Sequence, residues 1–371
     1  TWAYWIDAGR DLATDRRIQH TRSGFATKAA AESAMREALR GFENGTAVRA
    51  SPTTLAGYLE GWLANVRPNL RPTTWAGYRR DVANITDKLG KVRMQDLTPL
   101  QIETAYAQLL MKGRAGRPLS PKSVKNIHTA LRRALGDAER LGLIVRNPAR
   151  LAKPPTYHRP EIETWTADEL GGFLDHMQGD RLFAAYMLLA TTGMRRGEVF
   201  GLRWSDVKLN AGWLSIEQTL TTVDSKLILG ATKTARSRRR IALDAETITV
   251  LRDHKRRQAE ERLTVGPDWQ REPDLVFREL DGRPLHPDWF TKEFKRQARA
   301  AGLTGLRGPH GLRHTWATLA LQAGIHPKVV SERLGHSTIS ITLDTYSHVM
   351  PGMDVEAANV VAAKIFGGRS A

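Results

Sequence analysis

Residues 213–243 read WLSIEQTLTTVDSKLILGATKTARSRRRIAL, and this stretch breaks the helical spacing of apolar residues that surrounds it. It is rich in Leu, Ile, Thr and Val, and turn-forming residues stand at Asp224-Ser225 and at 234–237. Such runs between turn signals indicate short strands. We therefore predict a three-stranded antiparallel sheet here, set within a mainly helical domain.

Helices are expected on both sides of this sheet. Thr166 and Glu169 have the spacing of a capping box, which satisfies backbone N–H groups at a helix start, and the apolar run behind them extends to about Thr192. Helical spacing resumes at Asp244 and continues to the end of the chain. Residues 161–371 are therefore predicted to form one α-rich domain with a small antiparallel sheet.

The preceding residues, 50–145, have the apolar spacing of four short helices, which is typical of a compact bundle. Thr98-Pro99 and Ser120-Pro121 mark the starts of the third and fourth helices, because proline costs nothing at the first helical position. The next segment, 146–160, is predicted to be a linker because prolines interrupt helices and hold a chain extended. These prolines are Pro148, Pro154, Pro155 and Pro160.

The first 49 residues are predicted to form a separate β-sheet-plus-helix module. Thr1–Asp7 alternates, with Trp2, Tyr4 and Ile6 on one side, and residues 16–25 can return as strands after a turn at 9–15. Thr27 is a candidate N-cap for a helix that ends near Phe42. The fold class is therefore mainly α with small β-sheets, in three parts.

Charge points to a polyanionic partner. The formal net charge is +17 and the sequence pI is about 10.3, which favours nucleic acid over other partners. The chain has no cysteine, so disulfides, cysteine-ligated zinc and thiol chemistry are excluded. The longest apolar run, Leu182–Ala190, is too short to span a bilayer, and no signal peptide is recognisable. We expect a cytoplasmic protein without a membrane partner.

Five short segments carry candidate chemistry: TGMRRGEV at 192–199, TKTARSRRR at 232–240, HGLRH at 310–314, LGH at 334–336 and TYSH at 345–348. Each has a structural alternative when taken alone. Arg195 could pair with Glu198, Lys233 could be a solvated hairpin tip, and Tyr346 could be a core residue. His310 and His314 have the spacing of a zinc-binding helix, but glycine stands where a metallohydrolase needs glutamate.

Together these residues form a set suited to attack on a phosphodiester. Arginine binds phosphate oxygens with a two-pronged fork and keeps its charge, and stabilising the charge that develops is usually the largest catalytic contribution. A lysine can protonate a leaving oxygen, and a tyrosine among cations can act as nucleophile while histidine orients it or takes its proton. No carboxylate cluster suited to Mg²⁺ is evident, so no cofactor is expected.

These segments resemble the signature boxes of the tyrosine recombinases, the phage integrase family, in the family's order, over about Thr166 to His348. By this resemblance Arg195 and Arg313 hold the phosphate, Lys233 protonates the 5′-oxygen, and His310 assists proton transfer. His336 binds the scissile phosphate, Tyr346 forms a 3′-phosphotyrosine, and Glu198 supports the site. His314 and His348 are expected to be structural neighbours.

The resemblance implies a site-specific DNA recombinase of a phage or mobile element, independent of metal and ATP, acting as a homotetramer in the host cytosol at the nucleoid. It implies that residues 1–49 bind arm-type sites, 50–145 bind core sites and 161–371 form the catalytic domain. A directionality factor and a host DNA-bending protein are further partners that such a protein can use. The tail 354–366, with an apolar side, could dock on a neighbouring protomer or pack on its own domain.

Several basic residues are expected to contact DNA, although each could also belong to a solvated face: Arg10, Arg16, Arg17, Arg22, Arg79, Arg80, Lys122, Lys125, Arg132, Arg133, Arg236, Arg238 and Arg239. Two alternative functions stay open: a type IB topoisomerase shares the chemistry, and a DNA-binding regulator would lack it. A zinc hydrolase that uses His310 and His314 fails for lack of an acid partner. A regulator has no need of an aligned tyrosine, and the N-terminal module favours recombination over relaxation.

Overall fold

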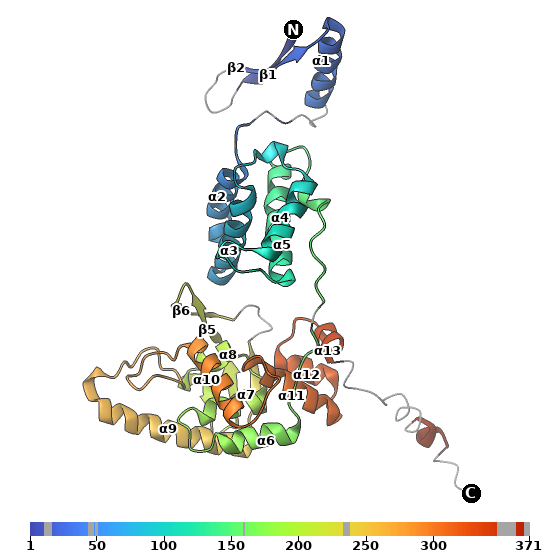
Figure 1. Ribbon diagram of the computed structural model, residues 1–371. Coiled ribbons are helices and arrows are strands. Elements are labelled where there is room, and N and C mark those ends of the chain that lie inside the picture. The colour runs from blue at the N-terminus through green and yellow to red at the C-terminus, as the bar shows by residue number, and fades with distance from the viewer. Residues whose placement is uncertain are drawn as a thin grey trace. The chain divides into compact units, whose positions relative to one another are not determined.

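The computed structural model describes residues 1–10, 17–43, 48, 51–158, 160–232, 238–346 and 361–366, with the backbone alone at 8–10, 17–20, 42 and 43. The chain divides into two compact units, Thr1–Arg159 and Pro160–Ala371 (Figure 1). Within the described ranges, no helix is both long and apolar enough to cross a membrane. The predicted class, mainly helical with small antiparallel sheets, is confirmed.

The N-terminal module consists of two antiparallel strands and a helix, β1 (Trp2–Arg10), β2 (Arg17–Phe25) and α1 (Lys28–Glu43). Tyr4 and Ile6 are buried on the face predicted from the alternation, and the Tyr4 ring stacks on Phe25 at a centroid distance of 5.7 Å. The Thr27 hydroxyl accepts a hydrogen bond from the Ala30 N–H at 3.2 Å, which confirms the predicted N-cap. The predicted turn lies mostly outside the described residues.

Four helices form the predicted bundle: α2 (Leu55–Val66), α3 (Pro72–Leu89), α4 (Pro99–Met111) and α5 (Pro121–Arg140). The starts of α4 and α5 are the predicted ones, since the hydroxyls of Thr98 and Ser120 accept hydrogen bonds from backbone N–H groups at 3.3 and 3.2 Å. Each such cap contributes about 1 kcal/mol. The apolar stripes of the helices meet in one core, in which residues such as Leu59, Ile102 and Leu135 are fully buried.

The first part of the expected linker packs on this bundle. Asn147 is fully buried, and its side chain donates to the Arg132 carbonyl and accepts from the Ala149 N–H, both at 2.9 Å. Ala149 and Ala152 join the core. A buried amide with satisfied hydrogen bonds is held in place. Residues 153–158, beyond this point, have no regular secondary structure.

The second unit begins with α6 (Ala167–His176), α7 (Phe183–Thr192) and the short α8 (Arg196–Phe200). The predicted capping box is present, with the Glu169 carboxylate accepting from the Thr166 N–H at 2.8 Å. Helix α7 is buried along almost its whole length. Around it an aromatic cluster links Phe173, Tyr186 and Phe294, with ring centroids 5.5–6.4 Å apart. This core fixes where α7 ends and where Arg195 emerges.

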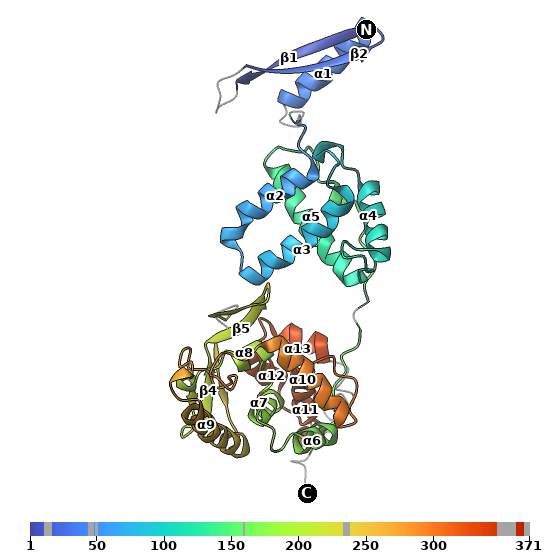
Figure 2. The same cartoon turned by 60° about the vertical axis from the view of Figure 1, so that its left-hand side comes forward.

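The sheet differs from the prediction. Strands β3 (Val207–Lys208), β4 (Trp213–Ile216) and β7 (Arg239–Ala242) form one antiparallel sheet, whereas β5 (Gln218–Val223) and β6 (Lys226–Ala231) form a separate hairpin. The predicted turn at Asp224 and Ser225 is confirmed, and both residues have positive φ, which suits a two-residue hairpin. The hairpin leaves the sheet because β5 packs on α8, where the Gln218 amide donates to the Gly201 carbonyl at 2.8 Å. It projects from the unit in Figures 1 and 2.

The remaining described helices are α9 (Ala245–Val265), α10 (Pro287–Ala300), α11 (His310–Gln322), α12 (Pro327–Leu334) and α13 (Ile339–Tyr346). In both views α9 and α11–α13 lie on opposite sides of the unit (Figures 1 and 2). The prediction of helix from Asp244 to the end is wrong for residues 269–286, which form an irregular excursion. Of the tail, 361–366 is helical, with Val361, Ile365 and Phe366 exposed.

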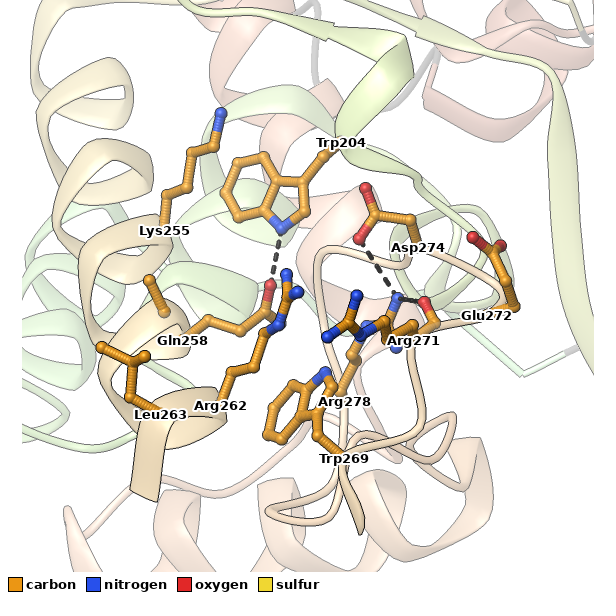
Figure 3. Close-up of a pocket in the computed structure, with 11 residues that line it drawn as sticks. Trp204, Lys255, Gln258, Arg262, Leu263, Trp269, Arg271, Glu272, Asp274 and Arg278 are labelled. Carbon is orange, nitrogen blue, oxygen red and sulfur yellow. Dashed lines mark hydrogen bonds and ion pairs between the residues drawn. The ribbon is translucent and has the colours of Figure 1, made fainter. Parts of the chain in front are cut away.

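This excursion is built around one buried cation, Arg278, which is only 2% exposed. Its guanidinium donates to the carbonyls of Gln270, Arg271, Pro273, Leu275 and Gly282 and to the Asp274 carboxylate. Figure 3 shows Arg278 beside Trp269 and Arg271, across from α9. A segment without a regular ladder needs other partners for its carbonyls, and a planar group with five N–H donors supplies them from one point.

Replacing Arg278 with lysine should therefore destabilise the second unit. Lysine has three donors in place of five, so buried carbonyls lose their partners, at about 1–3 kcal/mol for each group. We expect the R278K protein to unfold at a lower urea concentration than wild type, with a loss of about 2–4 kcal/mol in unfolding free energy.

Arg283 provides the control, because it lies in the same excursion with its side chain 63% exposed and paired to Asp281. The R283K protein should unfold within about 0.5 kcal/mol of wild type, as exposed ion pairs contribute little. Equal stability of R278K and R283K would show that the carbonyls around Arg278 do not depend on it.

Candidate active site

The candidate site is organised by the C-terminal end of α12. Three successive carbonyl oxygens there each accept a hydrogen bond from a different arginine: Arg239 Nε donates to Arg333 O at 2.6 Å, Arg313 Nη2 to Leu334 O at 2.7 Å, and Arg195 Nη2 to Gly335 O at 3.2 Å. The last carbonyls of a helix lack partners within it and lie at the negative end of its dipole. They therefore hold three cations close together.

Two glycines allow this arrangement. Gly193 and Gly335 end α7 and α12 in the left-handed conformation, with φ of 66° and 67°, which costs glycine little. Gly193 O accepts from Arg313 Nη1 at 2.9 Å. A Cβ at Gly335 would lie 2.9 Å from Arg239 Nη1, and a Cβ at Gly193 would lie 2.7 Å from Leu334. A side chain at Gly335 would displace Arg239, and one at Gly193 would displace the side chains of Leu334 and Trp316.

A buried carboxylate, Glu198, balances part of this charge. It is 4% exposed and pairs with Arg195 Nη1 at 2.7 Å and with Arg239 Nη2 at 2.9 Å. Its Oε2 also accepts from the Arg195 N–H at 2.9 Å. Burial alone would raise the pKa of Glu198, but Arg239 and Arg195 outweigh it and the pKa is lowered. Glu198 thus stays ionised and fixes Arg195 from both main chain and side chain.

Arg239 belongs to the site, although the sequence analysis did not place it among the site residues. We expected it to contact DNA, but the structure places its side chain in the interior, 7% exposed and bound to Glu198. Strand periodicity gave a signal: Arg239 and Ile241 are two apart on β7, so they point to the same face, and Ile241 is buried. Its role in the structure is to hold Glu198 against the end of α12.

Arg313 is buried, with 2% exposure, and bridges the ends of α7 and α12 through its two terminal nitrogens. Burial, reinforced by the positive charge of Arg195, lowers the pKa of Arg313 to about 9. Bringing an anion into the site relieves this repulsion between like charges. Arg195, with its side chain 37% exposed, provides the accessible part of the pair.

Two histidines lie beside these arginines. His310 is the first residue of α11, and His336 follows α12, where its Nδ1 lies 2.8 Å from Thr342 Oγ1. Burial lowers the pKa of His310 to about 4, with further contributions from His314 and Arg313, although part of its side chain is open to solvent. Burial and then Arg313 lower the pKa of His336 to about 4 as well. Both imidazoles are neutral at pH 7.

Tyr346 ends α13 and is 1% exposed, within a buried cluster that includes Ala317, Leu321, Val330 and Leu334. Its hydroxyl oxygen lies 2.7 Å from His314 Nδ1. We expected His314 to be a structural neighbour, yet it contacts the reactive atom of the candidate nucleophile directly. The signal was the spacing of four from His310, which places both rings on one face of α11.

The structure brings together Arg195, Glu198, His310, Arg313, His336 and Tyr346 from segments far apart in sequence. Lys233 and His348 lie outside the described residues. In the part of the chain that the structure describes, no group of three or more His, Asp or Glu side chains is arranged to hold a metal ion. The arrangement offers arginine donors, neutral imidazoles and a tyrosine hydroxyl, which suits attack on a phosphodiester.

The other basic candidates lie elsewhere. Those with exposed side chains are Arg22, Arg79, Arg80, Lys122, Lys125, Arg132, Arg133 and Arg238. On the bundle, Arg133 donates to the Tyr78 hydroxyl at 2.8 Å and Arg79 lies over the Trp75 ring at 4.9 Å, so both are held in place. Arg10 and Arg17 are described by backbone alone, and Arg16 and Arg236 lie outside the described residues.

A pocket of about 640 Å³ lies on the α9 side of the second unit (Figure 3). Its lining includes Trp204, Lys255, Arg262, Trp269 and Glu272, with Lys255 over the Trp204 ring at 5.3 Å. None of the candidate catalytic residues lines it. The pocket is therefore separate from the cluster at the end of α12, which lies on the other side of the unit.

Comparison with known proteins finds matches to one protein family, and the matched residues include this cluster. The phage integrase family profile matches residues 164–352, and the profile of the phage integrase N-terminal SAM-like domain matches residues 54–110. A XerC-like tyrosine recombinase of Caldanaerobacter subterraneus is 30% identical, over 90% of this chain and 89% of that protein. The ICEBs1 integrase of Bacillus subtilis is 25% identical, over 96% of each chain.

Solved structures share the fold. The Tn1549 transposon integrase in complex with a circular intermediate DNA superposes with a TM-score of 0.71 and 21% identity, over 83% of this chain and 99% of that one. A λ integrase tetramer bound to a Holliday junction superposes with a TM-score of 0.55 and 20% identity, over 89% and 92%. At these identities the likeness establishes the fold alone.

Because His310 and His336 are neutral in the folded protein, the unfolding free energy should depend on pH. His310 and His336 have a pKa of about 4 in the folded protein, against about 6.5 in an unfolded chain. Between these values the unfolded chain binds protons that the folded protein refuses, so the unfolding free energy falls as pH is lowered from about 6.5 to about 4. We expect the melting temperature to fall between pH 7 and pH 5.

An H336N protein should lose less stability over the same interval, because asparagine does not titrate. If wild type and H336N lose the same amount, His336 takes up its proton in the folded state, and the assignment of a neutral imidazole is wrong. A ¹³C NMR titration of the histidine rings would show the same result directly, as a His336 signal that does not shift until well below pH 6.

Proposed function

The chain belongs to the phage integrase family of tyrosine-type site-specific recombinases, and we propose that Tyr346 is the nucleophile with which it cuts and rejoins DNA. The observation that carries this proposal is the cluster at the end of α12. Arg195 and Arg313 are anchored there to adjacent carbonyls, and Tyr346 packs against the same helix. An enzyme that binds a phosphodiester between fixed cations beside a tyrosine can exchange one phosphate ester for another.

Each residue has a proposed role. Arg195 and Arg313 hold the non-bridging oxygens, and His336 adds a hydrogen bond to them. Glu198, buried between Arg195 and Arg239, positions Arg195. His310 assists proton transfer, and Lys233, which falls between β6 and β7 in the sequence, protonates the leaving 5′-oxygen. Fixed charges that face the developing negative charge typically supply several kcal/mol of transition-state stabilisation, about 3–4 for one donor.

The proposed reaction needs neither ATP nor metal. Tyr346 attacks the phosphodiester, displaces a 5′-hydroxyl and forms a 3′-phosphotyrosine. The new ester keeps the energy of the bond that was broken, so a 5′-hydroxyl from the partner duplex can reverse the step and exchange strands. Two rounds, through a four-way junction, recombine two sites. On this basis the protein integrates or excises a phage or mobile element in the host cytosol, at the nucleoid.

We propose double-stranded DNA as substrate and a homotetramer as the working assembly. The helical bundle would bind the core site, with the exposed Arg79, Arg132 and Arg133 at the phosphates, and residues 1–49 would bind arm sites. The λ integrase tetramer on a Holliday junction supports this assembly by analogy. The exposed apolar residues of 361–366 could contact a neighbouring protomer. A directionality factor and a DNA-bending protein would act beside them.

The first test is for a covalent adduct. The protein is incubated in EDTA with attachment-site DNA taken from the element's integration junctions and nicked near the cleavage point. Because the nick lets the cut strand diffuse away, the adduct accumulates. We expect an SDS-resistant protein–DNA band with wild type and none with Y346F, while both proteins shift the same DNA in a native gel.

The other outcomes are equally informative. A band with Y346F would assign the attack to another residue. Binding without a band from wild type would favour a DNA-binding regulator, and relaxation of a supercoiled plasmid that lacks the site would favour a type IB topoisomerase. Loss of the band in EDTA alone would contradict metal-independent chemistry.

A second test concerns the N-terminal module. Binding arm and core sites at once raises the effective concentration of each. Removing residues 1–45 should therefore abolish recombination between full attachment sites while core-site binding and the Tyr346 adduct remain. Unchanged recombination by the truncated protein would mean that this module does not bind arm sites.

A further inference from the structure

His314 contacts both the proposed nucleophile, Tyr346, and the neighbouring His310. Its Nδ1 is 2.7 Å from the Tyr346 hydroxyl, and its ring meets the His310 ring edge to face, with centroids 5.0 Å apart. His314 follows Arg313 on α11, and the Arg313 guanidinium is hydrogen-bonded to the ends of α7 and α12. The imidazole is therefore held by contacts with Tyr346 and His310, one residue along α11 from the anchored Arg313.

The attack requires an acceptor for the tyrosine proton. A phenol with a pKa near 10 is almost wholly protonated at pH 7, and Tyr346 is 1% exposed, which limits the access of bulk water to its ring. A general base must lie within about 2.6–3.2 Å of the proton donor. The His314 nitrogen meets that condition, with a ring centroid 5.8 Å from that of Tyr346.

We propose that His314 is a catalytic residue that accepts the proton of Tyr346 during the attack, a role that rests on the proposed function. The O–H bond of Tyr346 breaks, its proton passes to Nδ1, and its electron pair forms the bond to phosphorus. The bond from phosphorus to the 5′-oxygen breaks, and the oxygen keeps the electron pair of that bond. The oxygen is then protonated by the general acid, the role proposed above for Lys233. When a 5′-hydroxyl reverses the step, His314 returns the proton to Tyr346.

His310 then assists this proton transfer indirectly. It lies one turn before His314 on α11, at the helix start, and its own edge is open to solvent. Its ring contact holds the His314 imidazole so that Nδ1 faces Tyr346. In the reactive tautomer Nε2 of His314 carries the hydrogen and Nδ1 carries the lone pair. His310 is thus a positioning residue for the proton acceptor.

The test uses the nicked attachment-site DNA and measures the single-turnover rate of adduct formation. Asparagine at 314 can keep a hydrogen bond at the place of Nδ1, but it cannot take a proton. We expect the H314N protein to bind the DNA as wild type does and to form the adduct about a hundredfold more slowly, the usual scale for general base catalysis. Imidazole in the buffer should restore much of the rate to H314A, and more basic imidazoles should restore more.

The matched control is H176N, since His176 lies on α6, outside the proposed site, with its Nε2 3.2 Å from the Gln297 side-chain oxygen. It should form the adduct at the wild-type rate. Normal adduct formation by H314N, or a slow H314A that no imidazole rescues, would overturn the role, the second because it would show that His314 only holds Tyr346 in place. If wild type itself formed no adduct, the proposed function would fall first and this role with it.

Discussion

One helix end determines the arrangement of the active site. The carbonyl oxygens of residues 333–335 at the end of α12 accept hydrogen bonds from Arg239, Arg313 and Arg195. Hydrogen bonds to charged groups contribute about 1.5–3 kcal/mol each, and the helix dipole favours cations at this end. The arginines are therefore in place before any substrate arrives. A site whose charges need no reorganisation stabilises a charged transition state most effectively.

Concentrating positive charge has a cost, and the surrounding residues offset it. Glu198 is buried between Arg195 and Arg239 and stays ionised. Burial, and after it the remaining positive charge, lowers the pKa of Arg313 and keeps the histidines at 310 and 336 neutral. A phosphodiester would relieve this excess, because its negative charge favours the protonated form of each neighbouring group. The free site is thus held in a state that favours an anion.

The rest of the catalytic unit serves to bring these groups together. The buried helix α7 ends at Gly193, whose carbonyl oxygen accepts a hydrogen bond from Arg313. Strand β7 carries Arg239, whose guanidinium donates to the Glu198 carboxylate. The hairpin β5–β6 and the excursion at 269–286 lie outside this network, and each has its own means of satisfying backbone groups. In the excursion that means is Arg278, which replaces a ladder of strand hydrogen bonds with one side chain.

Local features could be predicted from the sequence: capped helix starts at Thr27, Thr98, Ser120 and Thr166, the turn at Asp224-Ser225, and the set of side chains suited to a phosphodiester. These features depend on neighbours a few residues apart, which a sequence shows directly. Tertiary structure alone decided how the strands divide into two sheets, that Arg239 turns inward to Glu198, and that His314 meets Tyr346. Such choices depend on contacts between residues distant in sequence, where burial and hydrogen bonding, and not local spacing, select the partner.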